Sequence, residues 1–374
     1  MKPAARRAGA LTLTATLAER NIDLHLTVQP GQVVAVLGAN GTGKSTLLSL
    51  ISGLTRPDTG RIVLDDQVLV DTERGVWLPP HRRGVVLLAQ QALLFPHLTA
   101  AANVAFGPRS KGSTRKAANV AAERWLAAVD ATEFADRRPS QLSGGQAQRI
   151  AVARALAADP ALLLLDEPMA ALDVAVAPAL RQLLRRVLRE TSCTAMLVTH
   201  DLIDALSLAD RVIVLDAGRI VEDGPARTIL SQPRSAFAAR ISGIDLVAGI
   251  ADAHGLTTAD GTRIQGIVDP TCVPGELAVA VFSPNAVAVH LTLPTGSPRN
   301  HLAVTIAELE PRGELVRIHA VDIAGSTGGL IADVTAAAAA DLDLVPGKQV
   351  HYAIKATEIT IYPAATGVSK PTPG

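Results

Sequence analysis

The stretch GANGTGKS at residues 38–45 limits what this chain can fold into more than any other feature of its sequence. It follows the apolar run Val33–Leu37 and precedes TLLSLISGL, a segment suited to a helix. This is the strand, loop and helix order of a phosphate-binding loop. Its glycines can adopt backbone angles that a Cβ atom forbids, so consecutive amide N–H groups can point at phosphate oxygens. The pattern predicts an ATP site in an α/β domain. The residues expected to bind ATP are Gly38, Ala39, Asn40, Gly41, Thr42, Gly43, Lys44, Ser45 and Thr46.

Two side chains of this loop have distinct expected roles. Lys44 should reach the terminal phosphates, and the hydroxyl of Ser45 should bind Mg²⁺. The helix that follows directs the positive end of its dipole at the same negative charge. The loop is therefore expected to be an anion site that a magnesium ion completes.

Length and charge set further limits. At 374 residues the chain exceeds the size at which a single core stops growing, so two domains are expected. Its 35 basic and 35 acidic residues give no net charge, so no overall field attracts nucleic acid or anionic lipid. No apolar run is long enough to cross a bilayer, and membrane association is expected to come through a protein partner. Cys193 and Cys272 show neither disulfide nor zinc-site spacing, which fits a reducing cytosol.

The hydrophobic pattern divides the chain into two domains. Residues 1–240 alternate strand-length apolar runs with helix-length amphipathic stretches, as in an α/β domain. The expected strands are 33–37, 85–88, 161–165, 195–199 and 211–215, and the expected helical subdomain is about 90–158, with a helix at 114–129. Residues 241–364 are expected to form a small all-β barrel, with its core at about 297–363. Its expected strands are 302–307, 315–321, 330–334, 349–353 and 358–362, and a disordered tail is expected at 365–374.

Two segments imitate export or membrane signals. The N-terminal AGALTLTATLA follows several basic residues, but its apolar residues alternate with threonine as in a strand, so a signal peptide is rejected. The uncharged stretch 277–297 contains Pro284, His290 and Pro294, and we interpret it as β-hairpin material.

Three further motifs follow the phosphate-binding loop. LSGGQ at 142–146 precedes a good helix former, and its hydroxyl and glycine amides could form a second anion site; an ordinary helix cap is the alternative. LLLLDEP at 162–168 predicts a buried strand that ends in two carboxylates. Asp166 would hold Mg²⁺ through water, and Glu167 would act as general base on the attacking water. His200 ends a third apolar run, AMLVTH.

These motifs, in this order, resemble those of the ATP-binding cassette (ABC) family. The resemblance implies an ABC-type phosphate-loop ATPase domain with an inserted helical subdomain, followed by a small OB-like barrel. It also implies that His200 contacts the γ-phosphate, that Gln90 binds Mg²⁺ and water in the Q-loop, and that residues 171–173 form the D-loop. Gln90 is preferred over the adjacent Gln91 because of its spacing to Phe95. The further ATP contacts that the resemblance implies are Ser143, Gly144, Gly145, Gln146 and Asp173.

The same resemblance implies partners. In this family two copies form a head-to-tail homodimer, because each ATP lies between Lys44 of one copy and Ser143 of the other. Integral membrane permease subunits would receive the motion, and an extracellular or periplasmic substrate-binding protein would act indirectly. The implied location is peripheral, at the cytoplasmic face of the membrane. Two interpretations stay open for an apolar group of the helical subdomain. It could line a groove that receives a permease helix, or it could be plain core. Its members are Leu94, Phe95, Leu98 and Phe106.

One family feature is missing. Cassettes usually stack adenine on an aromatic residue upstream of the phosphate-binding loop, but the first aromatic residue here is Trp77. Leu11, Leu13 or Arg20 would then supply a weaker apolar or cationic platform. Base selectivity should be modest, while phosphate chemistry is unaffected.

The segment 77–107 and the C-terminal region resemble the ATPase subunits of molybdate importers, particularly the actinobacterial kind. GSPRN at 296–300 and IKATEI at 354–359 are similar to the oxyanion-binding segments of that family's small barrel. Hydroxyls, amides and cations suit a tetrahedral dianion, so a bound oxyanion such as molybdate could hold the ATPase open; a regulatory barrel without ligand is the alternative. The matching positions are Ser297, Arg299, Asn300, Lys355 and Thr357.

Other functions stay open at this stage. An importer of sulfate, iron or a sugar would also carry a C-terminal barrel. A cassette protein of DNA repair or translation would typically carry long coiled coils or two fused cassettes, and neither occurs in the sequence. An oxyanion storage module would not need the ATPase motifs, and an exporter half would often carry a fused membrane span.

Overall fold

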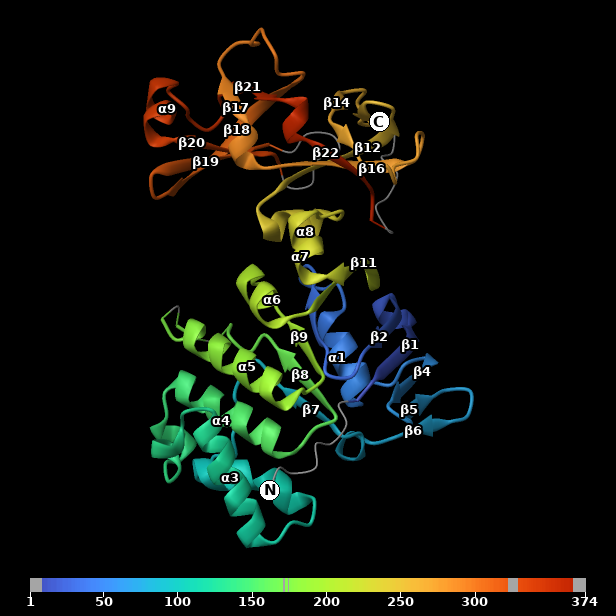
Figure 1. Cartoon of the computed structure of the whole chain (residues 1–374), viewed down its shortest axis with the longest axis vertical. Helices are drawn as coiled ribbons and strands as arrows, with labels where there is room; N and C mark the ends of the chain where they lie inside the picture. Colours follow the sequence, from blue (N-terminus) through green and yellow to red (C-terminus); the bar gives the residue numbers. More distant parts are fainter. Residues whose placement is uncertain (1–8, 171, 174, 322–328, 366–374) are drawn as a thin grey trace. The chain divides into compact units, whose positions relative to one another are not determined.

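The computed structural model describes residues 9–170, 172–173, 175–321 and 329–365, and it divides into two compact units, Met1–Ala226 and Arg227–Gly374 (Figure 1). The first unit combines two β-sheets with helices, and the second consists mainly of β-strands. Each unit has its own hydrophobic core. This confirms the fold class that the sequence predicts, a mixed α/β domain followed by a small all-β barrel.

An antiparallel sheet with the order β2–β1–β4–β5–β6 begins the first unit. Buried and exposed residues alternate along β1, so Leu11 and Leu13 enter the core while Thr12 and Thr14 face solvent. This confirms the strand-like interpretation of the N-terminal segment. The strands are β1 (Leu11–Leu17), β2 (Ile22–Val28), β4 (Thr59–Leu64), β5 (Gln67–Asp71) and β6 (Val76–Trp77), with short 3-10 turns at η1 (Ala18–Arg20) and η2 (Pro80–Arg82).

The second sheet of this unit has the order β11–β10–β3–β9–β8–β7. Its strands are parallel except β11, which pairs antiparallel with β10. All five strands expected from the apolar runs are present, within one residue at each end. The strands are β3 (Val33–Leu37), β7 (Val85–Leu88), β8 (Leu162–Asp166), β9 (Ala195–Val198), β10 (Arg211–Asp216) and β11 (Arg219–Pro225).

Both faces of the parallel sheet are buried, which explains why its strands are apolar throughout. Along β8, Leu162 and Leu164 join the core that the antiparallel sheet and α1 (Lys44–Ser52) share. Leu163 and Leu165 join a second core with α5 (Ala177–Thr191) and the inserted helices. The sheet therefore lies between the antiparallel sheet with α1 and the layer that contains α5. A further helix, α6 (Leu202–Leu208), follows β9.

The helices inserted between β7 and β8 form the helical subdomain. They are α2 (Ala100–Ser110), α3 (Arg115–Ala128) and α4 (Gly144–Ala157), with 3-10 turns η3 (Thr132–Phe134) and η4 (Pro139–Gln141) between α3 and α4. Each of the three helices begins at a capping hydroxyl, from Thr99, Thr114 and Ser143, that accepts a hydrogen bond from a backbone N–H of the first turn. The helix expected at 114–129 is confirmed as α3.

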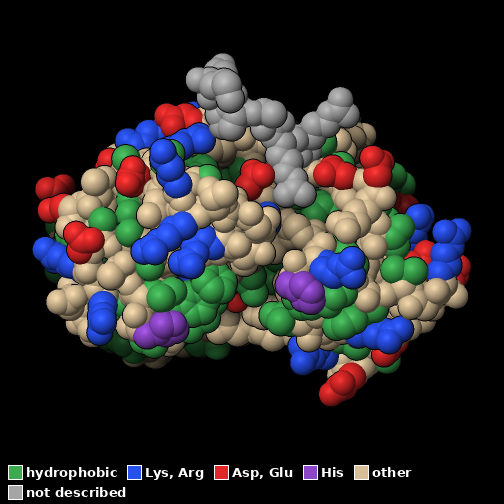
Figure 2. Space-filling view, turned by 90° about the horizontal axis from the view of Figure 1, so that it is seen from below, with side chains coloured by type: hydrophobic (Ala, Val, Ile, Leu, Met, Phe, Trp, Pro, Cys, Tyr) green, Lys and Arg blue, Asp and Glu red, His purple; other side chains and the backbone are tan. Residues whose placement is uncertain are grey.

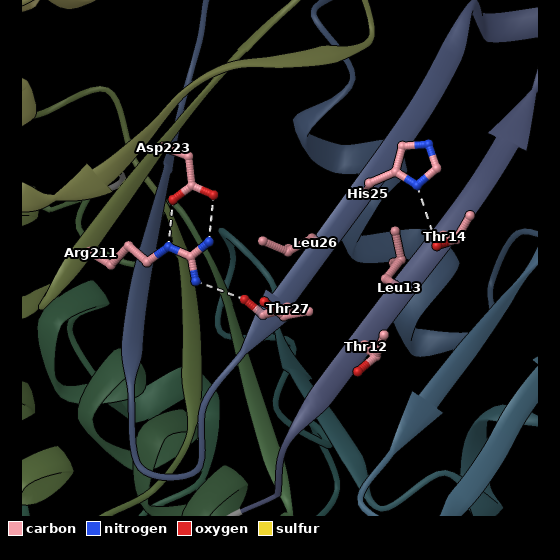
Figure 3. A pocket seen from close by; sticks show the side chains of 8 residues that line it. All are labelled: Thr12, Leu13, Thr14, His25, Leu26, Thr27, Arg211 and Asp223. Carbon is pink, nitrogen blue, oxygen red and sulfur yellow. Dashed lines mark hydrogen bonds and ion pairs between the residues drawn. The ribbon is translucent and has the colours of Figure 1, made fainter.

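Arg211 fastens the two sheets of the first unit to each other (Figure 3). Its guanidinium donates to both carboxylate oxygens of Asp223 on β11 and, through Nη1, to the carbonyl oxygen of Thr27 on β2 at 2.8 Å. A shallow pocket lies beside this contact, lined also by Leu13, Thr14 and His25. Because these contacts already use the charge of Arg211, we assign no ligand to this pocket.

The second unit begins with α7 (Ala226–Ser231) and α8 (Ala236–Ser242), followed by sheets of order β14–β13–β12–β16–β22–β15 and β17–β21–β18–β19–β20. Both sheets contribute to one core, in which Tyr352 is fully buried. The strands are β12 (Asp245–Asp252), β13 (Gly255–Thr257), β14 (Arg263–Gln265), β15 (Ile267–Val268), β16 (Leu277–Phe282), β17 (Ala288–His290), β18 (Asn300–Arg312), β19 (Leu315–Ala320), β20 (Ile331–Thr335), β21 (Gln349–Ile354) and β22 (Thr360–Pro363), with helices α9 (Ala336–Asp341), η5 (Pro284–Ala286) and η6 (Ala356–Glu358).

Two expectations for this unit need correction. The stretch 277–297 contains two strands, but they do not pair as a hairpin: β16 lies between β12 and β22, whereas β17 pairs with β21. The turn η5, with Pro284 at its start, redirects the chain from one sheet to the other. Ala365, expected to begin a disordered tail, is buried and its N–H donates to the carbonyl oxygen of Arg234 at 3.2 Å. Residues 366–374 lie outside the described residues.

The helices within the described ranges are too short or too polar to cross a membrane.

Candidate functional site

Four sequence motifs emerge at one edge of the parallel sheet. The strands β3, β9, β8 and β7 are consecutive neighbours and run in the same direction. The phosphate-binding loop follows β3, His200 follows β9, Asp166 and Glu167 stand at the end of β8, and Gln90 follows β7. Because the carboxyl ends of neighbouring parallel strands form the ligand-binding edge of an open α/β sheet, these groups face one site.

The backbone of the phosphate-binding loop requires glycine at two positions. Gly38 has a φ of 155°, and a Cβ there would lie 2.5 Å from the carbonyl oxygen of Leu215, a backbone atom that cannot move aside. Gly43 has a φ of 106°, and its Cβ would lie 2.5 Å from the Cδ1 atom of Ile22. The loop is therefore held tightly against neighbouring strands, which fixes the directions of its amide groups.

Lys44 lies within this loop with its ammonium group turned back onto it. The Nζ atom donates to the carbonyl oxygens of Gly38 and Ala39, both at 2.8 Å, and the residue is only 7% exposed. Burial lowers the pKa of Lys44, while the negative charges of Glu167 and Asp166 act in the opposite direction. The lysine charge therefore lies between the loop and the carboxylates of β8, where a terminal phosphate would be expected.

The far end of the phosphate-loop helix is held by Arg83, which is fully buried. Its Nη1 donates to the carbonyl oxygens of Leu50 and Ile51 at 2.8 and 3.0 Å, in the last turn of α1, and its Nε donates to Leu78 at 2.7 Å. Burial lowers the pKa of Arg83 to about 10. The cation lies at the negative end of the helix dipole whose positive end faces the loop. The sequence gives no signal for this role, because arginine is rarely buried.

Glu167, directly after β8, lies beside His200, which follows β9. Glu167 adopts a left-handed φ of 45°, unusual for a residue with a side chain, and its Oε1 lies 3.4 Å from Nδ1 of His200. Burial, followed by the charge of Glu167, raises the pKa of Asp166. The acid pair and the histidine therefore meet as the sequence order implies. Strained backbone of this kind is often found where a side chain must take a particular direction.

A buried network supports the turn that carries His200. The hydroxyl of Thr199 donates to Oδ2 of Asp204 at 3.1 Å, and Arg181 on α5 donates to Oδ1 of Asp204 at 2.6 Å. Burial raises the pKa of Asp204, and the arginine and threonine hydrogen bonds oppose the shift. These supporting residues are not among those that the sequence predicts. The THDxxD pattern at 199–204 could have indicated them, because Asp201 caps α6 and places Asp204 in its first turn.

The second anion motif lies at the start of α4, and Figure 1 shows α4 and α1 in separate parts of the unit. Ser143 and Gln146 form a capping box: the serine hydroxyl accepts from the Gln146 N–H at 3.3 Å, and Gln146 Oε1 accepts from the Ser143 N–H at 3.0 Å. The cap and the expected anion site are thus both compatible with the geometry. A Cβ at Gly145 would lie 2.7 Å from Val176, whereas Gly144 is open.

The segment expected as the D-loop is described only in part. Ala171 lies outside the described residues. Asp173 is exposed, and its carbonyl oxygen accepts from the N–H groups of Val176 and Ala177 at the start of α5. Gln148 donates to the carbonyl oxygen of Pro168 at 3.1 Å. This bond ties α4, the signature helix that follows the LSGGQ motif, to the end of the LLLLDEP motif.

The expected magnesium ligands lie at the edge of the parallel sheet where these motifs meet. They are the hydroxyl of Ser45 in the first turn of α1, the carboxylate of Asp166 at the end of β8 and the amide oxygen of Gln90 after β7. Ser45 and Gln90 are exposed, so neither is used in packing. A few hard oxygen donors that leave positions for water and phosphate oxygens fit Mg²⁺, which keeps part of its hydration shell.

Two of the three residues suggested as an adenine platform cannot serve. Leu11 and Leu13 are each 1% exposed and belong to the core beneath the antiparallel sheet. The alternation of β1 turns them inward, so the suggestion was wrong for both. Arg20 is exposed, and its Nη1 donates to the hydroxyl of Thr46 on α1 at 3.2 Å. A cation is therefore present beside the phosphate-binding loop.

The two segments suggested for oxyanion binding lie side by side in the second unit. Asn300 is the first residue of β18 and pairs with Ile354, the last residue of β21. Its buried amide donates to the carbonyl oxygens of Gln265 and Ile354 and accepts from the Gln265 N–H at 2.7 Å. These bonds give Asn300 a structural role. The other four positions are exposed: Ser297, Arg299, Lys355 and Thr357.

An ATPase of the ATP-binding cassette type is defined by this combination of features: the glycine-dependent phosphate loop, the acid pair Asp166 and Glu167, the histidine His200 and the signature helix α4. Family models agree: that of the ABC transporter matches residues 22–170, and that of the TOBE domain matches residues 296–361. The chain belongs to the ATP-binding proteins of ABC transporters.

The curated relatives cover the chain to different extents. The molybdenum import ATP-binding protein ModC of Mycobacterium tuberculosis (strain H37Rv) is 49% identical over 95% of this chain and 97% of its own length. The Fe(3+) ions import ATP-binding protein FbpC 3 of Rhodococcus jostii (strain RHA1) is 44% identical over 68% of each chain. The putative 2-aminoethylphosphonate import ATP-binding protein PhnT of Salmonella typhi is 35% identical over 81% of this chain and 82% of its own.

Proposed function

We propose that this chain is the ATP-hydrolysing subunit of an importer for molybdate (or tungstate). The observation that carries the proposal is the extent of the 49% identity to the molybdenum import protein, which runs through 95% of the chain and so includes the second unit. The iron import relative matches only 68% of the chain. The likeness to the molybdenum import protein therefore extends over more of the chain than the likeness to the iron import protein.

The proposed reaction uses the side chains and amides that lie at the carboxyl ends of the parallel strands. The amides of the phosphate-binding loop and the ammonium group of Lys44 bind the phosphates of ATP. Glu167 accepts the proton of the attacking water, and His200, beside it, orients the terminal phosphate. Magnesium, when bound by Ser45, Asp166 and Gln90, supplies positive charge against the phosphate oxygens.

A second copy of the chain completes each site in this proposal. Ser143 and the amides of Gly144 and Gly145 stand at the start of α4. The helices α4 and α1 lie in separate parts of the unit (Figure 1). In a head-to-tail homodimer they would close over the phosphate held by the partner's loop, with Asp173 and Gln146 at the same interface. Closure on ATP and opening after hydrolysis would then drive transport.

The permease is proposed to contact the segment that follows Gln90. Leu93 is 65% exposed and Phe106 is 46% exposed, and the rings of Phe95 and Phe106 lie 4.6 Å apart. Exposed apolar groups of this kind are typical of interaction surfaces. Seen from below in Figure 2, hydrophobic side chains gather in patches flanked by Lys and Arg. Binding to a permease would place the subunit at the cytoplasmic face of the membrane, and a substrate-binding protein would act only through the permease.

The choice of substrate can be tested in the assembled transporter. We expect molybdate and tungstate, presented with their binding protein, to stimulate ATP hydrolysis and to accumulate inside vesicles, and we expect ferric iron, sulfate and 2-aminoethylphosphonate to do neither. Stimulation by ferric iron alone would favour the iron importer, which the 44% identical relative makes the second candidate.

The second unit is proposed to bind the oxyanion as a regulator. Ser297, Arg299, Lys355 and Thr357 can offer hydroxyls and cations to a tetrahedral dianion at the paired ends of β18 and β21. We expect molybdate on the ATP side to inhibit hydrolysis and Lys355→Ala to weaken this inhibition. Arg312→Ala, an exposed cation at the opposite end of β18, is the matched control. Unchanged inhibition in Lys355→Ala would contradict the site.

A further inference from the structure

Arg154, in the last turn of the signature helix α4, holds the chain just after the Q-loop position. Its Nη1 donates to the carbonyl oxygen of Leu93 at 3.0 Å, and its Nη2 donates to that of Ala92 at 3.3 Å. The guanidinium carbon lies 5.3 Å from the centre of the Phe95 ring. One side chain thus contacts three residues of the segment that begins two positions after Gln90.

Backbone carbonyls and an aromatic face take the place of an acidic partner. Within the described ranges, the hydrogen bonds of the Arg154 guanidinium go to backbone carbonyls and not to acidic side chains. Burial lowers the pKa of this guanidinium. A planar guanidinium can bind two carbonyl groups and stack on a ring at once, which the ammonium group of lysine cannot do. The contact therefore fixes both position and direction.

The segment held by Arg154 is also fixed to α2. Asn103, fully buried, accepts from the Phe95 N–H at 2.8 Å and donates to the carbonyl oxygens of Phe95, Leu98 and Thr99. Leu93 adopts a left-handed φ of 38°, a conformation that needs support from its surroundings. Residues 92–99, α2 and the end of α4 are therefore joined by polar contacts.

The helix α4 connects this contact to the opposite end of the subdomain. Ser143 caps its first turn, and Arg154 lies eleven residues further along, so about 16 Å of helix separates the two. A helix of this length transmits a displacement as a rigid rod. A shift of residues 92–95 must therefore either break the Arg154 contacts or move the start of α4 with it.

We propose that Arg154 is a positioning residue that makes the segment after Gln90 and the signature helix move together. In this way the docking of the transport partner at residues 92–106 sets where Ser143 is presented to the second copy, and closure of the dimer is felt in turn at the partner site. The inference rests on the proposed function, because it assumes that Ser143 acts in an ATP-driven dimer.

The test compares Arg154→Gln and Arg154→Lys in a Glu167→Gln background, which we expect to hold ATP without turning it over. ATP affinity is measured by equilibrium binding to dilute subunits, and ATP-driven dimerisation by sedimentation. We expect ATP affinity to stay within about twofold, because the phosphate-binding loop is untouched, and the dimer Kd to rise about tenfold in Arg154→Gln. Arg154→Lys should lie between it and the parent, since it keeps the charge but not the paired contacts.

Arg186→Gln is the matched control. Arg186, on α5, also donates to a backbone carbonyl of the helical subdomain, that of Ala128 at 3.0 Å, but it does not touch residues 92–95. It should dimerise like the parent. If Arg154→Gln fails to fold, Arg154→Lys decides alone.

Three results would overturn the inference. Parent-like dimerisation of both Arg154 variants would remove the coupling role. Equal losses of ATP affinity and dimerisation, with a lowered melting temperature, would reduce Arg154 to a structural residue. A parent that binds ATP but never dimerises would overturn the proposed function, and this inference with it.

Discussion

Asp245 gives the second unit a stability that should depend on pH. It is the first residue of β12 and is 3% exposed; Oδ1 accepts from the Ile331 N–H at 2.7 Å, and Oδ2 has no hydrogen-bond partner among the described residues. Burial raises the pKa of Asp245 to about 8, against the smaller opposing effects of the Ile331 hydrogen bond and the Arg317 charge. Arg317 is itself paired with Asp333 at 2.6 Å, so it cannot neutralise Asp245 fully.

The direction of the effect follows from which state binds the proton. Between the unfolded pKa of about 4 and the folded value, the folded state holds a proton that the unfolded state releases. The contribution of Asp245 to the free energy of unfolding is therefore highest below about pH 4. It falls as pH rises and levels off above about pH 8. At about 1.4 kcal/mol per pH unit, the loss between about pH 6 and about pH 8 should be about 2 kcal/mol.

Asp245→Asn removes the titrating proton while keeping the acceptor for Ile331. We expect its unfolding free energy to lack this slope, apart from a pH-independent offset of about 1–3 kcal/mol for a donor left without a partner. Urea unfolding at several pH values, followed by tyrosine absorbance, measures it, because both tyrosines, Tyr352 and Tyr362, lie in the second unit. Asp341→Asn, an exposed carboxylate of the same unit, is the control and should keep the wild-type profile. Equal slopes in wild type and Asp245→Asn would refute the reasoning.

Three further predictions concern the first unit. Glu167→Gln should bind ATP while kcat falls by about 100-fold or more, because the proposed general base is lost. Phosphate release measures this, and residual turnover above about a tenth of wild type would exclude Glu167 as the base. Arg83→Met should destabilise the unit by about 3 kcal/mol, because three buried carbonyl contacts lose their donor. Tryptophan fluorescence during denaturation measures this loss of stability, and a change below about 1 kcal/mol would contradict the role assigned to Arg83. Arg20→Ala should raise the KM for ATP about two- to fivefold at unchanged kcat, because one cation–π contact with adenine would be lost. An unchanged KM would show that adenine does not stack on Arg20.

Much of the catalytic unit could be predicted because its signals are local. A strand buried on both faces, such as β8, appears in the sequence as an unbroken apolar run. Phosphate-binding motifs have fixed spacing, and Lys44, Glu167 and His200 each follow an apolar strand-length run, which predicts that they meet at the carboxyl ends of parallel strands. The alternation along β1 was equally visible, yet its consequence for Leu11 and Leu13 was missed: residues that face the core cannot also stack on a ligand.

The remaining features depend on contacts between residues far apart in the sequence. Arg83 and Arg154 are held by backbone carbonyls of other segments, and no pattern around either residue indicates burial. Asn300 lies in a motif that resembles an oxyanion-binding segment, but its amide donates hydrogen bonds to carbonyl oxygens of residues 35 and 54 positions away. The pairing of β16 with β12 and β22, and of β17 with β21, likewise depends on strands outside 277–297, so the sequence of this stretch does not contain it.

The capping box at Ser143 restricts which residue can stand at that position. A hydroxyl has two lone pairs and one hydrogen; one lone pair accepts from Gln146, and the hydrogen stays available for an outside acceptor. Aspartate would cap the helix as well but would bring a negative charge and no hydrogen to an incoming anion. Alanine would offer neither function. A small neutral group that accepts inward and donates outward fits both roles, so helix capping and the proposed ligand contact favour the same side chain for different reasons.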